Sequence, residues 1–250
     1  MAKRTAQLSN VSNIDSAKLV HSNKLRVTLD GMATFQPLTD NQNKFYQLYK
    51  KQTPGILLHG VAGTGKTFIA LYKALEEVLD KGNPFHQVVV VRSAVPSREI
   101  GHLPGDEHDK SEVYMAPYID ICDRLFYNRT DAWQRLEEQK AVRFMITSFV
   151  RGITLDNSII IVDECQNMTD MELNSIMTRI GNHSKIIFCG DFRQTDLYKK
   201  HDQSGINKFI AIVDAMPSFQ TVEFDVEDIV RSDLVKEYIL ARMQYEDTYK

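Results

Sequence analysis

A stretch of eight residues in the first third of the chain has the types and spacing of a phosphate-binding loop. Residues 60–67 read G-V-A-G-T-G-K-T and fit the pattern G-x-x-x-x-G-K-[ST]. Crowded phosphates need many backbone N–H donors at close range, and glycines allow both that approach and positive φ values. Lys66 is expected to reach the β- and γ-phosphates, and the Thr67 hydroxyl is expected to bind Mg²⁺. The predicted nucleotide contacts are Gly60, Val61, Ala62, Gly63, Thr64, Gly65, Lys66 and Thr67.

Two adjacent acids end a continuous apolar run further along the chain. Asp163 and Glu164 follow the isoleucine-rich residues 158–162. Asp163 is expected to hold the Mg²⁺ shell, and Glu164 to orient or deprotonate an attacking water. A strand that simply ends in two solvated acids is the alternative, but the phosphate-binding loop upstream favours the catalytic interpretation.

A third polar group follows the apolar run 185–189. Gly190 and Asp191 lead there to Gln194, whose neutral amide could contact both the γ-phosphate and the attacking water. Such a group would report whether the phosphate is present. An ordinary polar turn is the alternative, and the two neighbouring motifs make it less favoured.

Short β-branched runs alternate with stretches of helical period, which predicts an α/β doubly wound fold with a mostly parallel sheet. Strands are expected at residues 55–59, 87–92, 143–147, 158–163, 185–189 and 221–224, and a further short one at 24–29. Helices are expected at residues 67–79, 170–180 and 234–245. The last is expected to pack one face on the body, and Trp133 to lie on a solvated helix face or a subunit contact.

Composition limits the protein class without indicating its chemistry. A chain of 250 residues with a net charge of −3 is not a strongly basic nucleic-acid coating protein. Three distant cysteines without a CxxC pair, and no signal peptide or apolar run of about 18 residues, favour a cytoplasmic protein without membrane contact. The seven histidines lack metal-ligand spacing. We expect an N-terminal extension over 1–34 and a single domain over 35–250.

The motifs, taken in order, resemble the PhoH-like ATPases, whose core is similar to the first RecA-like domain of superfamily 1 helicases. The matching stretches are 60–67, 160–167 and 190–194, with further likeness at 91–95, 101–106, 149–152 and 228–231. The resemblance covers roughly residues 35–245. It implies a P-loop NTPase fold and Mg²⁺-dependent ATP hydrolysis.

The resemblance also implies residue roles and partners. Gln42 would read the adenine edge, and Arg231 would act on the γ-phosphate, either within its own chain or from a neighbouring subunit. Arg92 and Arg151 could contact nucleic acid or couple the sheet to it. The expected partners are single-stranded RNA or DNA and further copies of the chain, with a hexameric ring as one form of homo-oligomer.

Two functional classes remain open. One is an oligomeric, helicase-like ATPase that acts on RNA or another nucleic acid. The other is a binding or assembly protein that is switched by ATP and moves no strand. The length allows only one RecA-like domain, whereas a complete helicase of this type has two.

Overall fold

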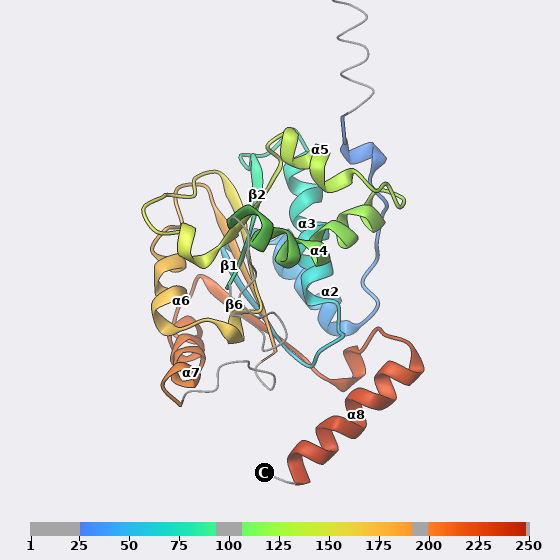
Figure 1. Ribbon diagram of the computed structural model, residues 1–250, viewed down its shortest axis with the longest axis vertical. Helices are drawn as coiled ribbons and strands as arrows, with labels where there is room; N and C mark the ends of the chain where they lie inside the picture. Colours follow the sequence, from blue (N-terminus) through green and yellow to red (C-terminus); the bar gives the residue numbers. More distant parts are fainter. Residues whose placement is uncertain (1–25, 94–106, 192–199, 249–250) are drawn as a thin grey trace, which may run out of the picture.

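The computed structural model describes residues 26–93, 107–191 and 200–248, except for the side chains of 107–112, 200–204 and 247 (Figure 1). Its centre is a six-stranded sheet in the order β3-β2-β4-β5-β1-β6, with parallel pairing throughout. The strands are β1 (Gly55–Gly60), β2 (Gln87–Arg92), β3 (Val142–Ile146), β4 (Ser158–Asp163), β5 (Lys185–Gly190) and β6 (Phe219–Phe224). These six strands confirm the predicted ones to within two residues.

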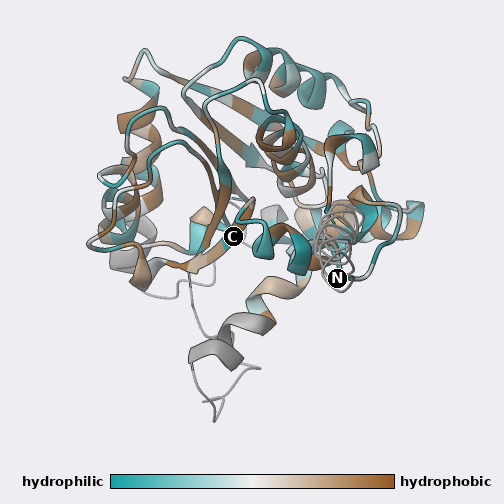
Figure 2. Cartoon of the chain, turned by 90° about the horizontal axis from the view of Figure 1, so that it is seen from above, coloured by the Kyte–Doolittle hydropathy of each residue, from teal (hydrophilic) through white to brown (hydrophobic). Residues whose placement is uncertain are grey.

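Helices cover both faces of the sheet, as expected for strands that are apolar on both sides. On one face lie α2 (Asp40–Lys50), α3 (Lys66–Leu79), α4 (Glu107–Leu125) and α5 (Ala132–Glu138); on the other lie α6 (Asp170–Met177) and α7 (Lys200–Asp214). Each face has its own buried apolar cluster. Figure 2 shows hydrophobic residues along the central strands. The predicted α/β doubly wound architecture is therefore confirmed.

Local sequence signals explain where several helices begin. The Thr169 hydroxyl accepts from the Glu172 N–H while the Glu172 carboxylate accepts from the Thr169 N–H, so a complete capping box starts α6. Thr39 caps α2 in a similar way by accepting from the backbone of Gln42. None of the helices within the described ranges is long and apolar enough to cross a membrane.

The prediction of a strand at 24–29 is wrong for the residues of it that the structure describes, 26–29. Residues 26–28 are extended but unpaired, and a single 3-10 turn, η1 (Leu29–Gly31), follows them. Val27 and Met32 are buried in the cluster around α3 and α4, and Ala33 N–H donates to the carbonyl of Leu125 (2.8 Å). The segment therefore buries its apolar residues against helices instead of pairing with an edge of the sheet.

Two further packing predictions need correction. In helix α8 (Asp233–Thr248), the predicted packing holds only in part, because Leu234 and Tyr238 are exposed at 76% and 63% (Figure 1). The helix borders the phosphate-binding loop through the half-buried Ile239 and Met243. Trp133 is buried and packs beside Tyr118, at 6.4 Å between ring centroids, because α5 closes over the sheet beside α4.

Candidate active site

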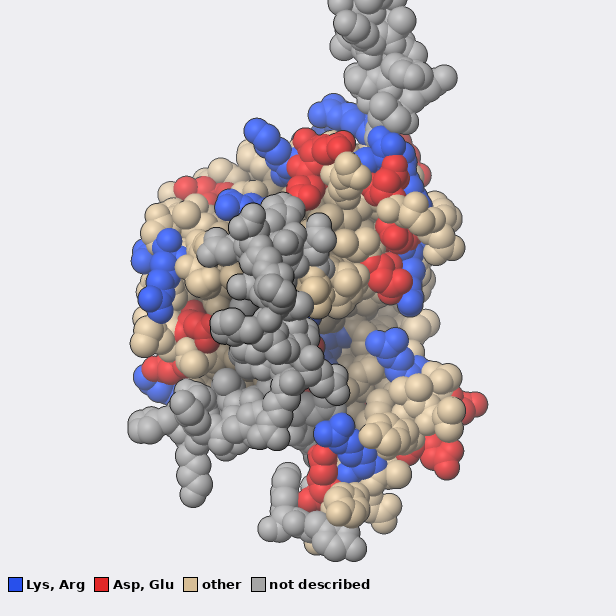
Figure 3. Space-filling model, viewed as in Figure 1, with Lys and Arg blue, Asp and Glu red and all other residues tan. Residues whose placement is uncertain are grey.

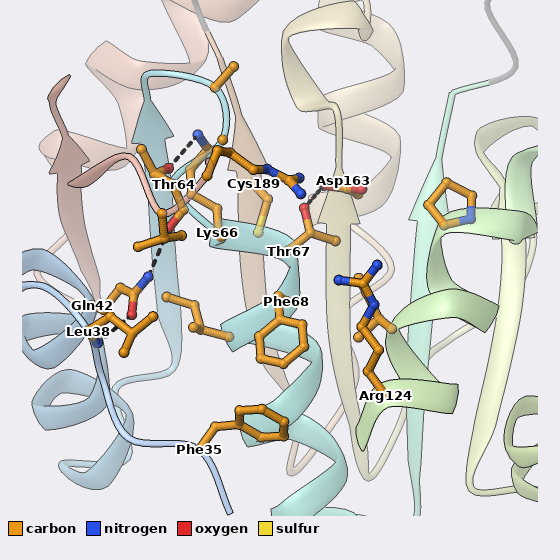
Figure 4. A pocket seen from close by; sticks show the side chains of 18 of the residues that line it. Phe35, Leu38, Gln42, Thr64, Lys66, Thr67, Phe68, Arg124, Asp163 and Cys189 are labelled. Atoms are coloured by element: carbon orange, nitrogen blue, oxygen red, sulfur yellow. Dashed lines mark hydrogen bonds between the residues drawn. The ribbon is translucent and has the colours of Figure 1, made fainter. Parts of the chain in front are cut away.

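A cavity of about 660 Å³ opens at the carboxyl ends of the parallel strands (Figure 4). Ligands of open α/β sheets bind at this edge, because the loops that follow the strands converge there. β1 leads into the phosphate-binding loop, β4 ends in Asp163, and β5 lies between these two strands. The predicted site residues that line the cavity are Gln42, Ala62, Gly63, Thr64, Gly65, Lys66, Thr67, Asp163, Glu164 and Arg231.

The glycines of the loop have the backbone conformations that their motif predicts. Gly65 caps α3 at φ 80°, in the left-handed region. Gly60 has φ 122°, and a Cβ atom there would lie 1.9 Å from the carbonyl oxygen of Phe224. At Gly65 another residue would be strained by the left-handed backbone. At Gly60 another residue would be strained and would also clash with the backbone of Phe224.

Lys66 lies over the loop with its ammonium group turned toward backbone oxygens. Its Nζ donates to the carbonyls of Gly60 (3.0 Å) and Val61 (2.8 Å) and to the Thr64 hydroxyl (3.2 Å). Burial lowers the pKa of Lys66, while the Asp191 carboxylate opposes that shift. The positive charge is therefore held at the loop whose N–H groups would face phosphates.

Thr67 and Asp163, distant in sequence, meet at the wall of the cavity. The Thr67 hydroxyl donates to Asp163 Oδ1 at 2.8 Å (Figure 4). The Tyr118 hydroxyl donates to Asp163 Oδ2 at 2.8 Å. Burial raises the pKa of Asp163 and the neighbouring Glu164 charge raises it further, while hydrogen bonds from Thr67 and Tyr118 oppose the rise. A cation here would favour the ionised carboxylate.

The donor set fits Mg²⁺ better than a metal held by protein alone. The described residues contain no group of three or more His, Cys, Asp or Glu side chains that could hold an ion. Mg²⁺ is usually bound through one or two carboxylate or hydroxyl oxygens together with substrate phosphates and waters. Thr67 and Asp163 supply those two oxygens beside the phosphate-binding loop.

Glu164 has a constrained backbone and a fixed carboxylate. Its φ of 52° and ψ of 40° lie in the left-handed region, which is uncommon for a residue with a side chain. Gln166 Nε2 donates to Glu164 Oε2 (2.6 Å), and Gln166 Oε1 accepts from the Asp191 N–H (3.1 Å). Gln166 thus joins the acid after β4 to the turn after β5, a link that sequence reasoning missed.

Arg231 comes to the loop of its own chain. The N–H of Val230 donates to the carbonyl of Gly63 (3.1 Å), and a Cβ on Gly63 would lie 3.0 Å from Arg231 Cγ. Asp228, which is 2% exposed, accepts from Asn41 Nδ2 (2.7 Å) through its Oδ2. The segment before α8 is therefore fastened to both the phosphate-binding loop and the start of α2.

Gln42 also contacts the phosphate-binding loop, from the start of α2. Its Oε1 accepts from the Leu38 N–H (2.8 Å), and its Nε2 donates to the Thr64 carbonyl (3.0 Å). The side chain thus already makes two bonds to protein, and its adenine contact stays a prediction. Phe35 and Phe68, which the sequence reasoning missed, line the same end of the cavity, edge to face at 5.0 Å.

The remaining predicted residues have different outcomes. Gln194 lies outside the described residues. Arg92 lines the cavity, and its guanidinium lies 5.7 Å from the centre of the Tyr114 ring. Arg151 is exposed and contacts Met171 Sδ at 3.1 Å. The nucleic-acid contacts expected of Arg92 and Arg151 stay predictions.

Comparison with known sequences gives a consistent match. The profile of a family described as PhoH-like protein matches residues 34–243. A PhoH-like protein of Bacillus subtilis is 34% identical over 183 residues, which cover 73% of this chain and 56% of that protein. Protein PhoH of Escherichia coli is 31% identical over 180 residues, covering 72% and 50%. The chain thus spans about half the length of these relatives.

Similarity to solved structures is weaker. The large terminase of a thermophilic bacteriophage has a TM-score of 0.49 at 16% identity, covering 86% of this chain and 51% of that one. Unliganded Pif1 from Bacteroides sp. has a TM-score of 0.37 at 15% identity, covering 79% and 43%. The strand order, with the phosphate-binding loop after β1 and the acids after β4, is that of a P-loop NTPase with a RecA-like sheet.

Proposed function

Because the chain belongs to the PhoH-like protein family, we propose that it binds ATP and hydrolyses it with the help of Mg²⁺ in the cavity above β1 and β4. The observation that carries the proposal is the hydrogen bond between Thr67 and Asp163. It joins the hydroxyl of the phosphate-binding loop to the acid of the buried strand. A glycine-rich turn with a purely structural role would not need a carboxylate beside it.

The proposed mechanism assigns each group a separate task. Backbone N–H groups of the loop and the Lys66 ammonium bind the phosphates, and the dipole of α3 adds positive potential. Thr67 and Asp163 would hold Mg²⁺, whose charge offsets that of the phosphate oxygens. Glu164, oriented by Gln166, accepts a proton from the attacking water. Arg231 and Gln194 would stabilise the charge on the transferred phosphate and orient that water.

We further propose that ATP hydrolysis serves an oligomeric, helicase-like action on single-stranded RNA or another nucleic acid. The resemblance to superfamily 1 motifs supports this use. The visible face gives no added support, since basic and acidic side chains are interspersed on it (Figure 3). The second class, an ATP-switched binding or assembly protein, needs only the one six-stranded sheet that the described residues form.

Replacing the proposed base tests the assignment directly. We expect Glu164→Gln to bind ATP as the parent does but to lower kcat by a factor of about 100 or more, the usual contribution of a general base. Lys66→Ala is expected to lose affinity for ATP. Phosphate release and binding of a fluorescent ATP analogue measure the two effects.

The exposed Glu137 on α5 provides a matched control. Glu137→Gln removes the same charge far from the cavity and is expected to retain the parent kcat. Normal turnover by Glu164→Gln would contradict the assignment of the base, and a parent protein that hydrolyses no ATP would contradict the proposed function itself.

A further inference from the structure

Tyr118 is a fully buried tyrosine whose hydroxyl ends at the metal side of the cavity. It lies on α4, and its side chain reaches across to β4, 45 residues away in sequence. Its hydroxyl donates to Asp163 Oδ2 at 2.8 Å. Tyr118 belongs to none of the motifs that indicate nucleotide chemistry.

The two oxygens of Asp163 have separate partners. Thr67 donates to Oδ1 and Tyr118 donates to Oδ2, so rotation of the carboxylate would break both bonds. The Thr67 hydroxyl is itself a proposed metal ligand, and binding a cation would redirect its oxygen. Tyr118, which also interacts with the Arg92 guanidinium, is not a proposed metal ligand, and it therefore remains as the fixed reference for the carboxylate.

The ring of Tyr118 is held firmly enough to act in this way. Its centroid lies 5.8 Å from that of Phe144 on β3 and 6.4 Å from that of Trp133 on α5. Pro117 and Ile121, its neighbours on α4, line the cavity. Packing against these two rings thus fixes the position of the phenol oxygen beside Asp163.

We propose that Tyr118 is a positioning residue that sets the affinity of the site for Mg²⁺ by orienting Asp163. The inference rests on the proposed function, since it concerns the same metal site. Partners that orient a metal ligand from behind contribute about 10–100-fold to metal affinity. The substitution Tyr118→Phe removes one hydroxyl and leaves the ring packing in place.

The test measures binding, without turnover, of a fluorescent ADP analogue. For Tyr118→Phe in EDTA, we expect the affinity of the parent protein, because the phosphate-binding loop is untouched. In a Mg²⁺ titration, we expect the concentration that gives half of the Mg²⁺-dependent gain in affinity to rise about tenfold. Tyr127→Phe is the matched control, because Tyr127 is 73% exposed; its midpoint should equal that of the parent.

A double-substitution cycle separates positioning from general destabilisation. In an Asp163→Asn background, adding Tyr118→Phe is expected to leave the Mg²⁺ dependence unchanged, because the oriented carboxylate is already gone. Thermal unfolding of each variant verifies that it is folded.

Two results would overturn the inference alone: an unchanged Mg²⁺ midpoint in Tyr118→Phe, or an equal loss of affinity in EDTA and in Mg²⁺. A parent protein that binds no nucleotide, or binds it independently of Mg²⁺, would overturn the proposed function together with the inference.

Discussion

Among single residues, Arg231 has the most specific consequence for how the site works. Val230 holds the backbone of this segment against Gly63, and the buried Asp228 ties it to Asn41. The guanidinium therefore lines the cavity of the chain that carries it. An arginine so placed can stabilise charge on a transferred phosphate without help from a neighbouring subunit.

This placement predicts the outcome of a mixing experiment. Arg231→Ala is expected to lower kcat by a factor of about 100 or more, in line with the loss of one transition-state donor. Mixing it with Lys66→Ala chains is expected to restore no hydrolysis, because each chain needs both groups in its own cavity. Phosphate release at constant total chain concentration measures the effect.

Arg26→Ala, a change at an exposed arginine away from the cavity, serves as the control in the same mixtures. Recovery of activity in the mixture of Arg231→Ala and Lys66→Ala would mean that the arginine acts between subunits.

The residues that sequence reasoning missed have no local signal. Lys66, Thr67 and Asp163 belong to motifs whose spacing reflects one local geometry, so their meeting could be predicted. Tyr118 reads as one more apolar position of a helix, and Gln166 as a polar residue after a strand. Their roles depend on contacts across the fold, with Asp163 and with the Asp191 N–H. Only the packed structure brings those partners together.

Among the elements, α3 and β5 are joined by a buried ion pair at the end of the sheet opposite the cavity. Lys185 begins β5 with a side chain that is 2% exposed, and its Nζ lies 2.8 Å from Glu77 Oε2. Gln52 Oε1 accepts from the same Nζ (3.1 Å), and the Tyr49 ring centre lies 3.9 Å away. The helix that begins with Lys66 is thereby anchored at its far end.

Breaking one side of this pair is expected to be costly. Glu77→Gln leaves the Lys185 ammonium without a counter-charge and should lower the free energy of unfolding by about 3 kcal/mol, as for other buried pairs. The double change Glu77→Leu with Lys185→Met should recover most of that loss. Urea unfolding at neutral pH measures the free energy of unfolding of both variants. An unchanged free energy of unfolding in Glu77→Gln would contradict the stabilising role of the ion pair.

Acid should act through the same carboxylate. Hydrogen bonds from Lys185 and Gln52, together with the Lys185 charge, outweigh burial and hold the pKa of Glu77 below its usual value. Its stabilising contribution is therefore present above the ordinary glutamate pKa and is lost as the pH falls through the lowered value. The double variant should lack this part of the acid dependence.

Prediction of the elements succeeded where burial alone decides structure. The inner strands β2 and β4 contain continuous apolar runs, and the sheet is covered on both faces, so pattern and outcome agree. The packing predicted for α8 holds at Ile239 but not at Leu234 or Tyr238, because periodicity states which residues are apolar and not what covers them. Helix α4 contains Pro117, helix α7 contains Gly205, and helix α2 begins with five polar residues, which hides these helices from the same reasoning.

At the scale of the whole molecule, the balance of charge sets a limit on partners. The net charge is −3, and the visible face mixes both signs, so any groove for nucleic acid is local (Figure 3). Binding through a few phosphate contacts weakens steeply with salt. The proposed action on nucleic acid is therefore expected only at low ionic strength.

Hydrolysis measured with and without single-stranded RNA separates the two proposed classes. At low salt we expect RNA to raise the rate per chain and the effect to fade as salt is added. Repeating the measurement over a range of protein concentrations tests the proposed oligomer, whose rate per chain should rise with concentration. A rate indifferent to RNA at low salt would favour the ATP-switched binding protein.

The hydrogen bond between Asn41 and Asp228 also bears on when, during synthesis, the nucleotide site can form. Its two partners are 187 residues apart, so at ordinary translation speeds Asn41 is synthesised about 10–40 s before Asp228. During that interval the phosphate-binding loop has been synthesised but still lacks the hydrogen bond from Val230 to Gly63. The nascent chain thus lacks the finished site until residues 225–231 have emerged, and only then can nucleotide binding favour the native state.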